Sequence, residues 1–406
     1  MIEDVSTAGA VKAPAAAFGG GKLTAGIVVA AVIAVAGIVL WGMQLSGGMV
    51  QTGMRNLDSW GLYIACFMFF VGLGTGSLII GAVPNAFGLK GFAGISKVAT
   101  AMALACMIAA VAFVIVDLGQ PLRMWELFVY SNVTSPLMWD IFTIPVYMVL
   151  LCAYLWATMR FEAGRMSQGA LRVLSVVVLS VAVLVLLVDG WIFSLQPGRE
   201  IWHTALLGPW FVSSALVCGT ALVVCSVVAL RAAGYLKAAH ADVVSLAKCL
   251  GAFVCVDLAF FACDLITEAY SGGSAVQVAQ MLTSGVLAPF FWVEIIGCVI
   301  CAIVCFVPKL RTAPFLVLAS LLAIVGIFCK RAQLLIGGFQ LPTIDLTGPM
   351  TSVSALNWQS GMTGVYEGLV YWPQPLEFGV TIGVVALSVL VFLLAVKLLP
   401  LGSRGE

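Results

Sequence analysis

Two neighbouring apolar segments of this chain carry carboxylates at the ends that face each other along the sequence. Asp117 ends one apolar segment and is followed by Arg123, while Trp139 and Asp140 open the next one. A carboxylate at the edge of hydrocarbon is energetically costly, so it is a candidate functional group. Burial and a nearby guanidinium shift its proton affinity in opposite directions, which allows proton exchange near neutral pH. We interpret Asp117 as a proton-exchanging catalytic residue that Arg123 tunes.

Each of these residues also has a structural interpretation. Asp117 and Arg123 could form an ion pair that closes the loop between the two segments. Asp140 could cap the helix that it opens, since an acid is favourable at a helix N-terminus. Trp139 could stack on an aromatic ligand, or simply anchor the membrane interface.

A third carboxylate, Asp189, interrupts an apolar run that continues into Gly190 and Trp191. No helix cap or helix dipole explains an acid there, so we predict that Asp189 accepts a proton or hydrogen-bonds to a carbonyl. The loop behind it contains Arg199 and His203. A histidine there could transfer protons, or it could have no special role.

Three more acids, Asp257, Asp264 and Glu294, lie in apolar segments of the second half of the chain. A series of intramembrane acids is what a proton path requires. Polar contacts that fix the packing of helices are the alternative. The sequence leaves both interpretations open.

The segments that position these residues belong to a chain that is 62% hydrophobic and 9% charged, with a mean hydropathy of +1.14. No soluble fold of 406 residues needs that much apolar sequence, so we predict an all-α, polytopic membrane protein. Ten stretches are long enough to span the membrane: 23–45, 59–83, 96–117, 138–159, 171–195, 207–230, 244–267, 286–307, 313–335 and 377–399.

Basic residues are distributed unequally between the two sides of these spans. Most Lys and Arg fall on the side of the N-terminus, which predicts a multi-pass protein of the cytoplasmic (inner) membrane with both termini in the cytoplasm. The basic residues assigned to the outer side are Arg55, Arg123, Arg199, Lys330 and Arg331. Most acids fall at or near the outer rim, so we expect the chemistry at the outer face.

Composition argues against several kinds of site. The two histidines, His203 and His240, fall in loops, so the chain cannot hold two bis-histidine haems. The cysteines lie singly along apolar helices, where cysteine packs as a small hydrophobic residue, and we predict no metal in this chain. A net charge of +1 argues against nucleic acid as a partner.

The chain resembles itself at an offset of about 150 residues. Asp117 and Asp264 each end a span, and residues 136–140 and 289–294 open the spans that follow with the same Pro, Trp and acid pattern. We predict two tandem four-helix bundles in parallel orientation, flanked by the first and last helices. The alternative is that Pro and Trp simply recur at helix starts. The predicted parts are a cytoplasmic tail 1–22, a flanking helix 23–57, bundles 58–206 and 207–335, an outer loop 336–376, and a last helix with tail 377–406.

Several motifs resemble the NrfD / polysulfide-reductase membrane-subunit family. They are Trp60-Gly61-Leu62-Tyr63, Asp117-Leu118-Gly119 with Pro121 and Arg123, Ser135-Pro136 with Trp139-Asp140, and Gly198-Arg199-Glu200-Ile201-Trp202-His203. The ten spans, Lys330-Arg331 and Tyr371-Trp372-Pro373 with Glu377 are similar to the longer branch of the family, which includes hydrogenase and alternative complex III membrane subunits.

The resemblance implies a haem-free membrane subunit of a respiratory complex that binds a menaquinone-type or ubiquinone-type quinone in its first bundle, near the outer face. We assign catalytic roles to Asp117, Asp189 and Arg123, and a proton path to the three acids of the second half. The expected quinone contacts are Trp60, Tyr63, Phe67, Trp139, Asp140, Trp191, Arg199 and His203. The implied partners are a ferredoxin-like iron–sulfur subunit with several clusters on the outer face, and a molybdopterin or other catalytic subunit.

Two other functions remain as alternatives. A proton-coupled transporter would use the intramembrane acids, although no span shows a Pro/Gly break matched in its repeat partner. A pure membrane anchor for a partner would need none of these acids. The long segment 336–376 is expected to cover the outer mouth or to contact an extramembrane partner.

Overall fold

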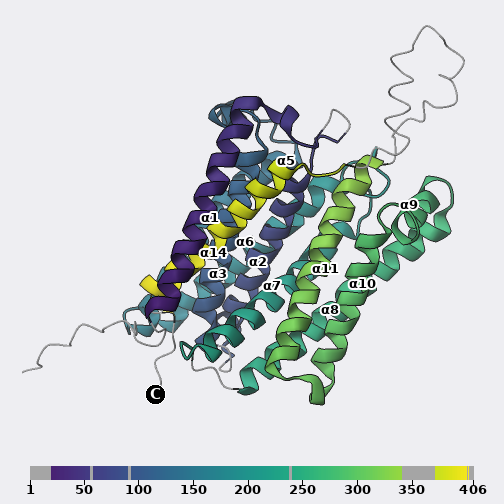
Figure 1. Ribbon diagram of the computed structural model, residues 1–406. Helices are drawn as coiled ribbons and strands as arrows, with labels where there is room; N and C mark the ends of the chain where they lie inside the picture. Colours follow the sequence, from purple (N-terminus) through teal and green to yellow (C-terminus); the bar gives the residue numbers. More distant parts are fainter. Residues whose placement is uncertain are drawn as a thin grey trace, which may run out of the picture.

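The computed structural model describes residues 20–54, 58–89, 93–236, 240–340, 371–399 and 401, and every regular element in this part of the chain is a helix. Ten helices are long and apolar enough to cross a membrane, and they form one bundle (Figure 1). They are α1 (Gly20–Gly47), α2 (Leu62–Phe87), α3 (Ala93–Asp117), α5 (Pro136–Glu162), α6 (Gln168–Ser194), α7 (Leu207–Ala232), α8 (His240–Ser271), α10 (Ala288–Phe306), α11 (Ala313–Gln340) and α14 (Pro375–Leu398). The prediction of an all-α protein with ten spans is confirmed.

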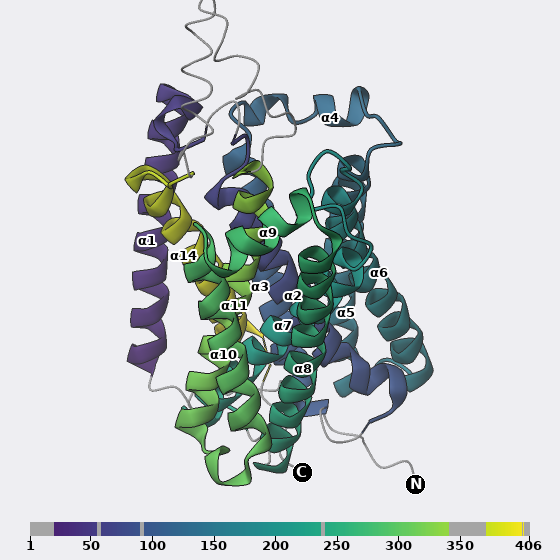
Figure 2. The ribbon, with the colours of Figure 1, turned by 90° about the vertical axis from the view of Figure 1, so that its right-hand side faces the viewer.

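Short helices lie in the connections between the spans: η1 (Met49–Gln51), η3 (Pro121–Arg123), α4 (Glu126–Val129), α9 (Ser274–Thr283) and η4 (Pro308–Leu310). α4 and α9 lie toward the same end of the bundle (Figure 2). We call it the α4 end, and the other end the opposite end. α3 finishes with Asp117 at the α4 end, so this acid lies where the sequence placed it, at a rim.

Local sequence explains where the spans begin and end. Within an apolar span, a helix satisfies every backbone polar group internally. Pro136 and Pro375 lie in the first turns of α5 and α14, where the missing N–H of proline has no helical partner to lose. Gly88 caps the C-terminus of α2, and its φ of +72° is a left-handed conformation that glycine adopts without strain.

α2 is the central helix and is almost entirely buried. It packs against α3 and α6, and with α5 these helices form a first group of four. A second group consists of α7, α8, α10 and α11. α1 and α14 pack on each other, and α14 also contacts α3, so the first and last spans flank the first group.

Small residues bring the two groups into contact where α2 crosses α7. A Cβ added to Gly76 would overlap the backbone carbonyl of Ala215, and a Cβ added to Gly219 would overlap the backbone of Gly76. Such close approach of backbones is a common way for helices to associate in a membrane. The same device joins α1 to α14 at Gly37 and Gly383.

One hydrogen bond occurs at equivalent positions of the two halves of the predicted repeat. The indole Nε1 of Trp139 donates to the Val133 carbonyl at 2.7 Å, and that of Trp292 donates to the Thr283 carbonyl at 3.1 Å. Each tryptophan thus links the start of its span to the preceding segment by one hydrogen bond. The tandem repeat and the predicted boundaries between parts remain predictions. Most of the N-terminal tail and residues 341–370 of the outer loop lie outside the described residues.

Two basic residues lie in a different place from the one predicted. Lys330 and Arg331 were assigned to the outer side, but both lie inside α11, which continues to Gln340, and both are buried. Acids and polar groups on neighbouring helices pair with Lys330 and Arg331 inside the bundle. These two residues therefore should not be counted when membrane orientation is inferred from basic residues in the loops.

Candidate functional site

A cavity of about 310 Å³ lies within the first group of helices at the α4 end. Its wall is mostly apolar, and three carboxylates, those of Asp117, Asp140 and Asp189, reach it. Trp60 and Phe67 of the predicted contacts also line it. The structure therefore brings together five of the predicted site residues, from four different segments of the chain.

Asp140 and Asp189 lie deepest among the three acids. Asp140 is 4% exposed and Asp189 is 1% exposed, and their carboxyl groups are in contact between α5 and α6. Neither oxygen of Asp189 accepts a hydrogen bond from an N–H or O–H group of the described residues. An unpaired buried carboxylate is costly, so this pair favours a proton or a polar ligand group in the cavity.

The capping interpretation of Asp140 is wrong. α5 begins at Pro136 with Ser135 at the N-cap position, and no side chain caps it. Asp140 lies in the following turn and faces the cavity. Ser135 and Pro136, rather than Asp140, mark the start of α5.

Aromatic rings form the rim of the cavity on the side of α2 and α6. Trp60 stacks on Trp202 with ring centroids 6.5 Å apart and meets the edge of Phe193 at 5.9 Å. Trp60 and Phe193 line the cavity, and Trp202, which does not line it, packs against both rings. Trp202 was not predicted as a site residue, although the motif that carries the resemblance contains it.

Other predicted contacts lie outside the cavity lining. Trp139 and Trp191 pack edge to face with centroids 6.3 Å apart. The Tyr63 hydroxyl donates to Gln44 Oε1 of α1 at 2.6 Å, so it joins α2 to the flanking helix.

The loop that follows α6 is held by two of the predicted contacts. Arg199 Nη1 donates to the Gly338 carbonyl of α11 at 2.9 Å, and His203 Nδ1 lies 3.0 Å from the Ser194 carbonyl. Arg199 also acts on Asp58: burial raises the pKa of Asp58, and the positive charge of Arg199 partly offsets that rise. These residues fix the loop at the α4 end and do not reach the cavity.

Arg123 is the clearest departure from the predicted site. Its guanidinium is exposed and binds both oxygens of Glu126 at 2.8 Å, which raises the pKa of Arg123. The charged group that acts on Asp117 is Glu377 of α14. The expected tuning of Asp117 by Arg123 is therefore absent, because an acid three residues along the loop pairs with the arginine instead.

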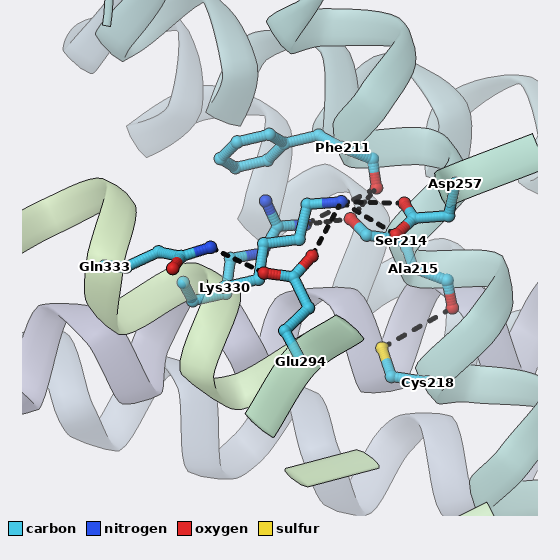
Figure 3. A network of polar contacts seen from close by, with 9 residues as sticks. Phe211, Ser214, Ala215, Cys218, Asp257, Glu294, Lys330 and Gln333 are labelled. Atoms are coloured by element: carbon cyan, nitrogen blue, oxygen red, sulfur yellow. Dashed lines mark hydrogen bonds and ion pairs between the residues drawn. The ribbon is translucent and has the colours of Figure 1, made fainter. Parts of the chain in front are cut away.

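The second group of helices holds a buried ionic cluster (Figure 3). Lys330 Nζ lies 2.8 Å from both oxygens of Asp257 and 4.0 Å from Glu294, to which Gln333 donates at 2.5 Å. The ammonium also lies 3.9 Å from the centroid of the Trp210 ring. The structure thus unites two predicted acids, Asp257 and Glu294, around a lysine that the sequence analysis had assigned to the outer side.

Arg331 lies between this cluster and the first cavity. Its Nη2 donates to Ser214 Oγ at 2.6 Å, and its Cζ lies 3.6 Å from the centroid of the Phe211 ring. Its positive charge acts on Asp189 from one side and on Asp257 from the other. The signal that could have identified it was a pair of cations inside an otherwise apolar span, which is rare without a functional or pairing role.

Asp264 adjoins the same cluster. It lines a small cavity of about 30 Å³ with Glu268, Lys330 and Arg331. That volume suits about one water molecule. All three acids predicted for the second half therefore lie close to Lys330.

Comparison with known sequences decides the family. Residues 50–343 match the family described as polysulphide reductase, NrfD. The chain belongs to the NrfD family. The matched region contains both groups of four helices, and the family is the one that the motifs around Trp60, Asp117 and Asp140 resembled.

Three relatives match this NrfD-family chain over nearly its full length. A putative membrane subunit of dimethyl sulfoxide reductase from Halobacterium salinarum is 30% identical over 400 residues, covering 92% of this chain and 90% of the relative. A selenate reductase subunit from Mesobacillus selenatarsenatis is 27% identical, with 92% and 93% covered. The Hdr-like menaquinol oxidoreductase integral membrane subunit of Archaeoglobus fulgidus is 29% identical, with 91% of each chain covered.

Proposed function

We propose that this chain is the quinone-binding membrane subunit of a respiratory oxidoreductase complex and that the cavity of the first group binds the quinone ring. The observation that carries the proposal is an apolar cavity into which unpaired carboxylates point, at one end of a membrane bundle. Its volume falls in the range of about 300–1,000 Å³ usual for small-molecule sites. The relatives support the role, since they are named as subunits of reductases and of a menaquinol oxidoreductase.

The residues of the cavity fit such a ligand. A quinone supplies reversible transfer of two electrons together with two protons when it is bound. Apolar walls between α3 and α5 suit a ring and its hydrocarbon tail. Trp60 and Phe193 exclude water at the rim, and the carboxyl groups of Asp117 and Asp189 are placed to hydrogen-bond to ring oxygens.

The three acids divide the handling of protons. Asp140 and Asp189 are in contact, so they hold one proton between them more readily than two negative charges. That proton can pass to or from a ligand oxygen at Asp189. Asp117, at the rim of α3, provides a second proton acceptor toward the α4 end.

The cluster around Lys330 extends this scheme to the second half. We assign to Asp257, Asp264 and Glu294 a proton path, with Arg331 as its electrostatic link to Asp189. A bound proton on any of these acids changes the net charge that Lys330 and Arg331 must balance. The alternative, a contact that only fixes the packing of α8, α10 and α11, predicts the same geometry without proton movement.

The proposed partners dock at the α4 end. Leu122, Trp125, Val129 and Tyr130 are exposed apolar residues of the loop that covers the cavity, and such patches mark interaction sites. We assign this surface to an iron–sulfur subunit that exchanges electrons with the quinone, and a molybdopterin or other catalytic subunit would complete the complex. The proposal includes no haem and no metal in this chain, and places it in the inner membrane with both termini in the cytoplasm.

A proton-coupled transporter is the second candidate, and the buried Asp257–Lys330 pair is the observation that favours it. Transporter sites commonly lie where spans are broken at mid-membrane. Each of the ten spans described here is one continuous helix. A transporter would move a substrate or ions across vesicles without a redox donor, whereas a quinone subunit would not.

The test uses the purified complex. We expect organic extraction to release a quinone, and the water-soluble analogue menadiol to quench tryptophan fluorescence and to be oxidised by the complex. Asp189→Asn is expected to lower menadiol oxidation by about 100-fold, the scale of lost acid–base catalysis. Asp242→Asn, which changes an acid in the first turn of α8, is the matched control and should leave turnover unchanged.

The proposal would be refuted by either of two results. One is a complex without extractable quinone that also fails to bind menadiol. The other is an Asp189→Asn complex that oxidises menadiol at the wild-type rate, which is the outcome that a pure membrane anchor predicts.

A further inference from the structure

Buried polar side chains continue from the cavity toward the opposite end of the first group. On α5 they are Asp140, Tyr147 and Tyr154, spaced seven residues apart, and none is more than 4% exposed. Seven residues make nearly two helical turns, so these side chains lie on one face of α5, at intervals of about 10 Å. Asp140 belongs to the proposed quinone site, but that site does not explain the two buried tyrosines on the same face of α5.

The far end of this series reaches the surface. Lys97 Nζ of α3 lies 2.7 Å from Glu162 Oε2, in the last turn of α5. The Lys97 side chain is 2% exposed, whereas that of Glu162 is 40% exposed. The ion pair therefore joins the buried interior to solvent at the opposite end.

A hydrogen-bonded group fills the next layer. The Tyr154 hydroxyl accepts from Asn85 Nδ2 at 2.7 Å and lies 3.4 Å from Ser96 Oγ. Asn85 Nδ2 also lies 3.2 Å from Ser96 Oγ, and the Gly81 carbonyl of α2 accepts from Tyr154 at 3.3 Å. Ser96 precedes Lys97 on α3, so this group is continuous with the ion pair.

Tyr147 occupies the gap between this group and the cavity. It is fully buried, and its hydroxyl has no hydrogen-bond partner among the residues that the structure describes. Side chains on a helix lean toward its N-terminus, so Tyr147 leans toward Asp140 and Tyr154 leans toward Tyr147. A buried hydroxyl without a partner costs about 1–3 kcal/mol, and bonding to water would recover that cost.

We propose that Asp140, Tyr147, Tyr154, Ser96, Asn85, Lys97 and Glu162 form a proton-transfer route between the cavity and the membrane face at the opposite end. The inference rests on the proposed quinone site and deepens it. Oxidation of one quinol releases two protons and two electrons. The electrons leave to a one-electron acceptor of the partner at the α4 end, and protons leave through this route, with both directions reversed during quinone reduction. Turnover therefore separates charge across the membrane.

The competing explanation is a polar network that only fixes the packing of α2, α3 and α5. Contacts such as Asn85 to Tyr154 serve that purpose. The hydroxyl of Tyr147 does not, since it contacts no donor or acceptor in the described part of the chain. Tyr147→Phe therefore separates the two explanations, because it removes the hydroxyl and keeps the packing volume.

The experiment uses the whole complex in sealed liposomes, with menadiol as donor, a membrane-impermeant one-electron acceptor that reoxidises the partner, and the dye oxonol VI reporting membrane potential. Wild-type complex is expected to give an uncoupler-sensitive dye response during turnover. Tyr147→Phe should lower turnover by about tenfold or more, while menadiol still quenches fluorescence with affinity within about twofold of wild type. Tyr235→Phe is the matched control: its hydroxyl donates to the Val396 carbonyl, away from the route, and this variant should match wild type.

Glu162→Gln provides a second measurement if Tyr147→Phe fails to assemble, because Glu162 is half-exposed. It should slow turnover while leaving menadiol binding intact. The route is overturned if Tyr147→Phe and Glu162→Gln both turn over at the wild-type rate, or if wild-type turnover gives no dye response. The proposed function fails separately, through loss of menadiol binding by the wild-type complex.

Discussion

Lys330 is the residue on which the buried charges of the second half depend. Its ammonium faces Asp257 and Glu294 within the bundle, and the structure gives Asp257 no other basic partner at salt-bridge distance in the described residues. Removing one member of a buried ion pair costs far more than removing both, because the remaining charge stays buried without compensation.

Lys330→Met should therefore lower the free energy of unfolding by about 3–5 kcal/mol. Lys330→Met combined with Asp257→Leu should recover a large part of that loss, since the uncompensated Asp257 carboxylate is then gone. Thermal unfolding of the detergent-solubilised protein, followed by tryptophan fluorescence, measures both. Equal melting temperatures for the single variant and wild type would show that the pair contributes little, and that the acids are neutral without the lysine.

At the scale of elements, the contact between α2 and α7 holds the two groups of helices together. Gly76 and Gly219 face each other there, with no space for a side chain. Gly76→Ala should force the helices apart and cost about 1–3 kcal/mol. The matched control is Gly42→Ala on α1, where an added Cβ meets nothing within 4 Å.

Melting temperatures of the two alanine variants test this contact. Gly76→Ala should unfold at a lower temperature than Gly42→Ala, and it should also weaken menadiol binding, since α2 carries Phe67 at the cavity and Trp60 directly precedes this helix. A Gly76→Ala protein as stable as the control would mean that α2 and α7 can separate without cost.

The elements also show what sequence reasoning could reach. Apolar length alone located the ten spans, because lipid leaves the backbone no alternative to the helix. Acids at unusual positions located Asp117, Asp140 and Asp189, and the structure places all three around one cavity. The pairing of charges was beyond the reach of hydropathy. It could not show that Arg123 meets Glu126 within one loop, or that Lys330 lies between Asp257 and Glu294 of two other helices. Assigning Lys330 and Arg331 to the outer side was wrong for the same reason, because both are buried inside α11.

At the scale of the whole molecule, the two ends of the bundle differ in charge. Basic residues gather at the opposite end, where Arg160 and Arg231 lie in the last turns of α5 and α7, and Lys309 and Arg311 follow α10. The three cavity carboxylates lie toward the α4 end. Arg331 lies inside α11, in the half of the bundle nearer that end. From the positive-inside rule we expect the opposite end to face the cytoplasm. The cavity would then lie near the outer face and Glu162 at the inner one.

Fusions of green fluorescent protein test this orientation, because the fluorophore forms only on the cytoplasmic side when export is through the general secretory pathway. A fusion after Glu406 should fluoresce, and a fusion after Gly273, at the α4 end, should stay dark. In the expected orientation, quinol oxidation releases protons into the cytoplasm and electrons at the outer face, so its charge movement opposes the membrane potential. If the two results were exchanged, the proton route from Asp140 to Glu162 would still join the cavity to the far face, but its charge movement would build the membrane potential during quinol oxidation. The orientation therefore decides whether this architecture conserves energy in that direction or consumes it.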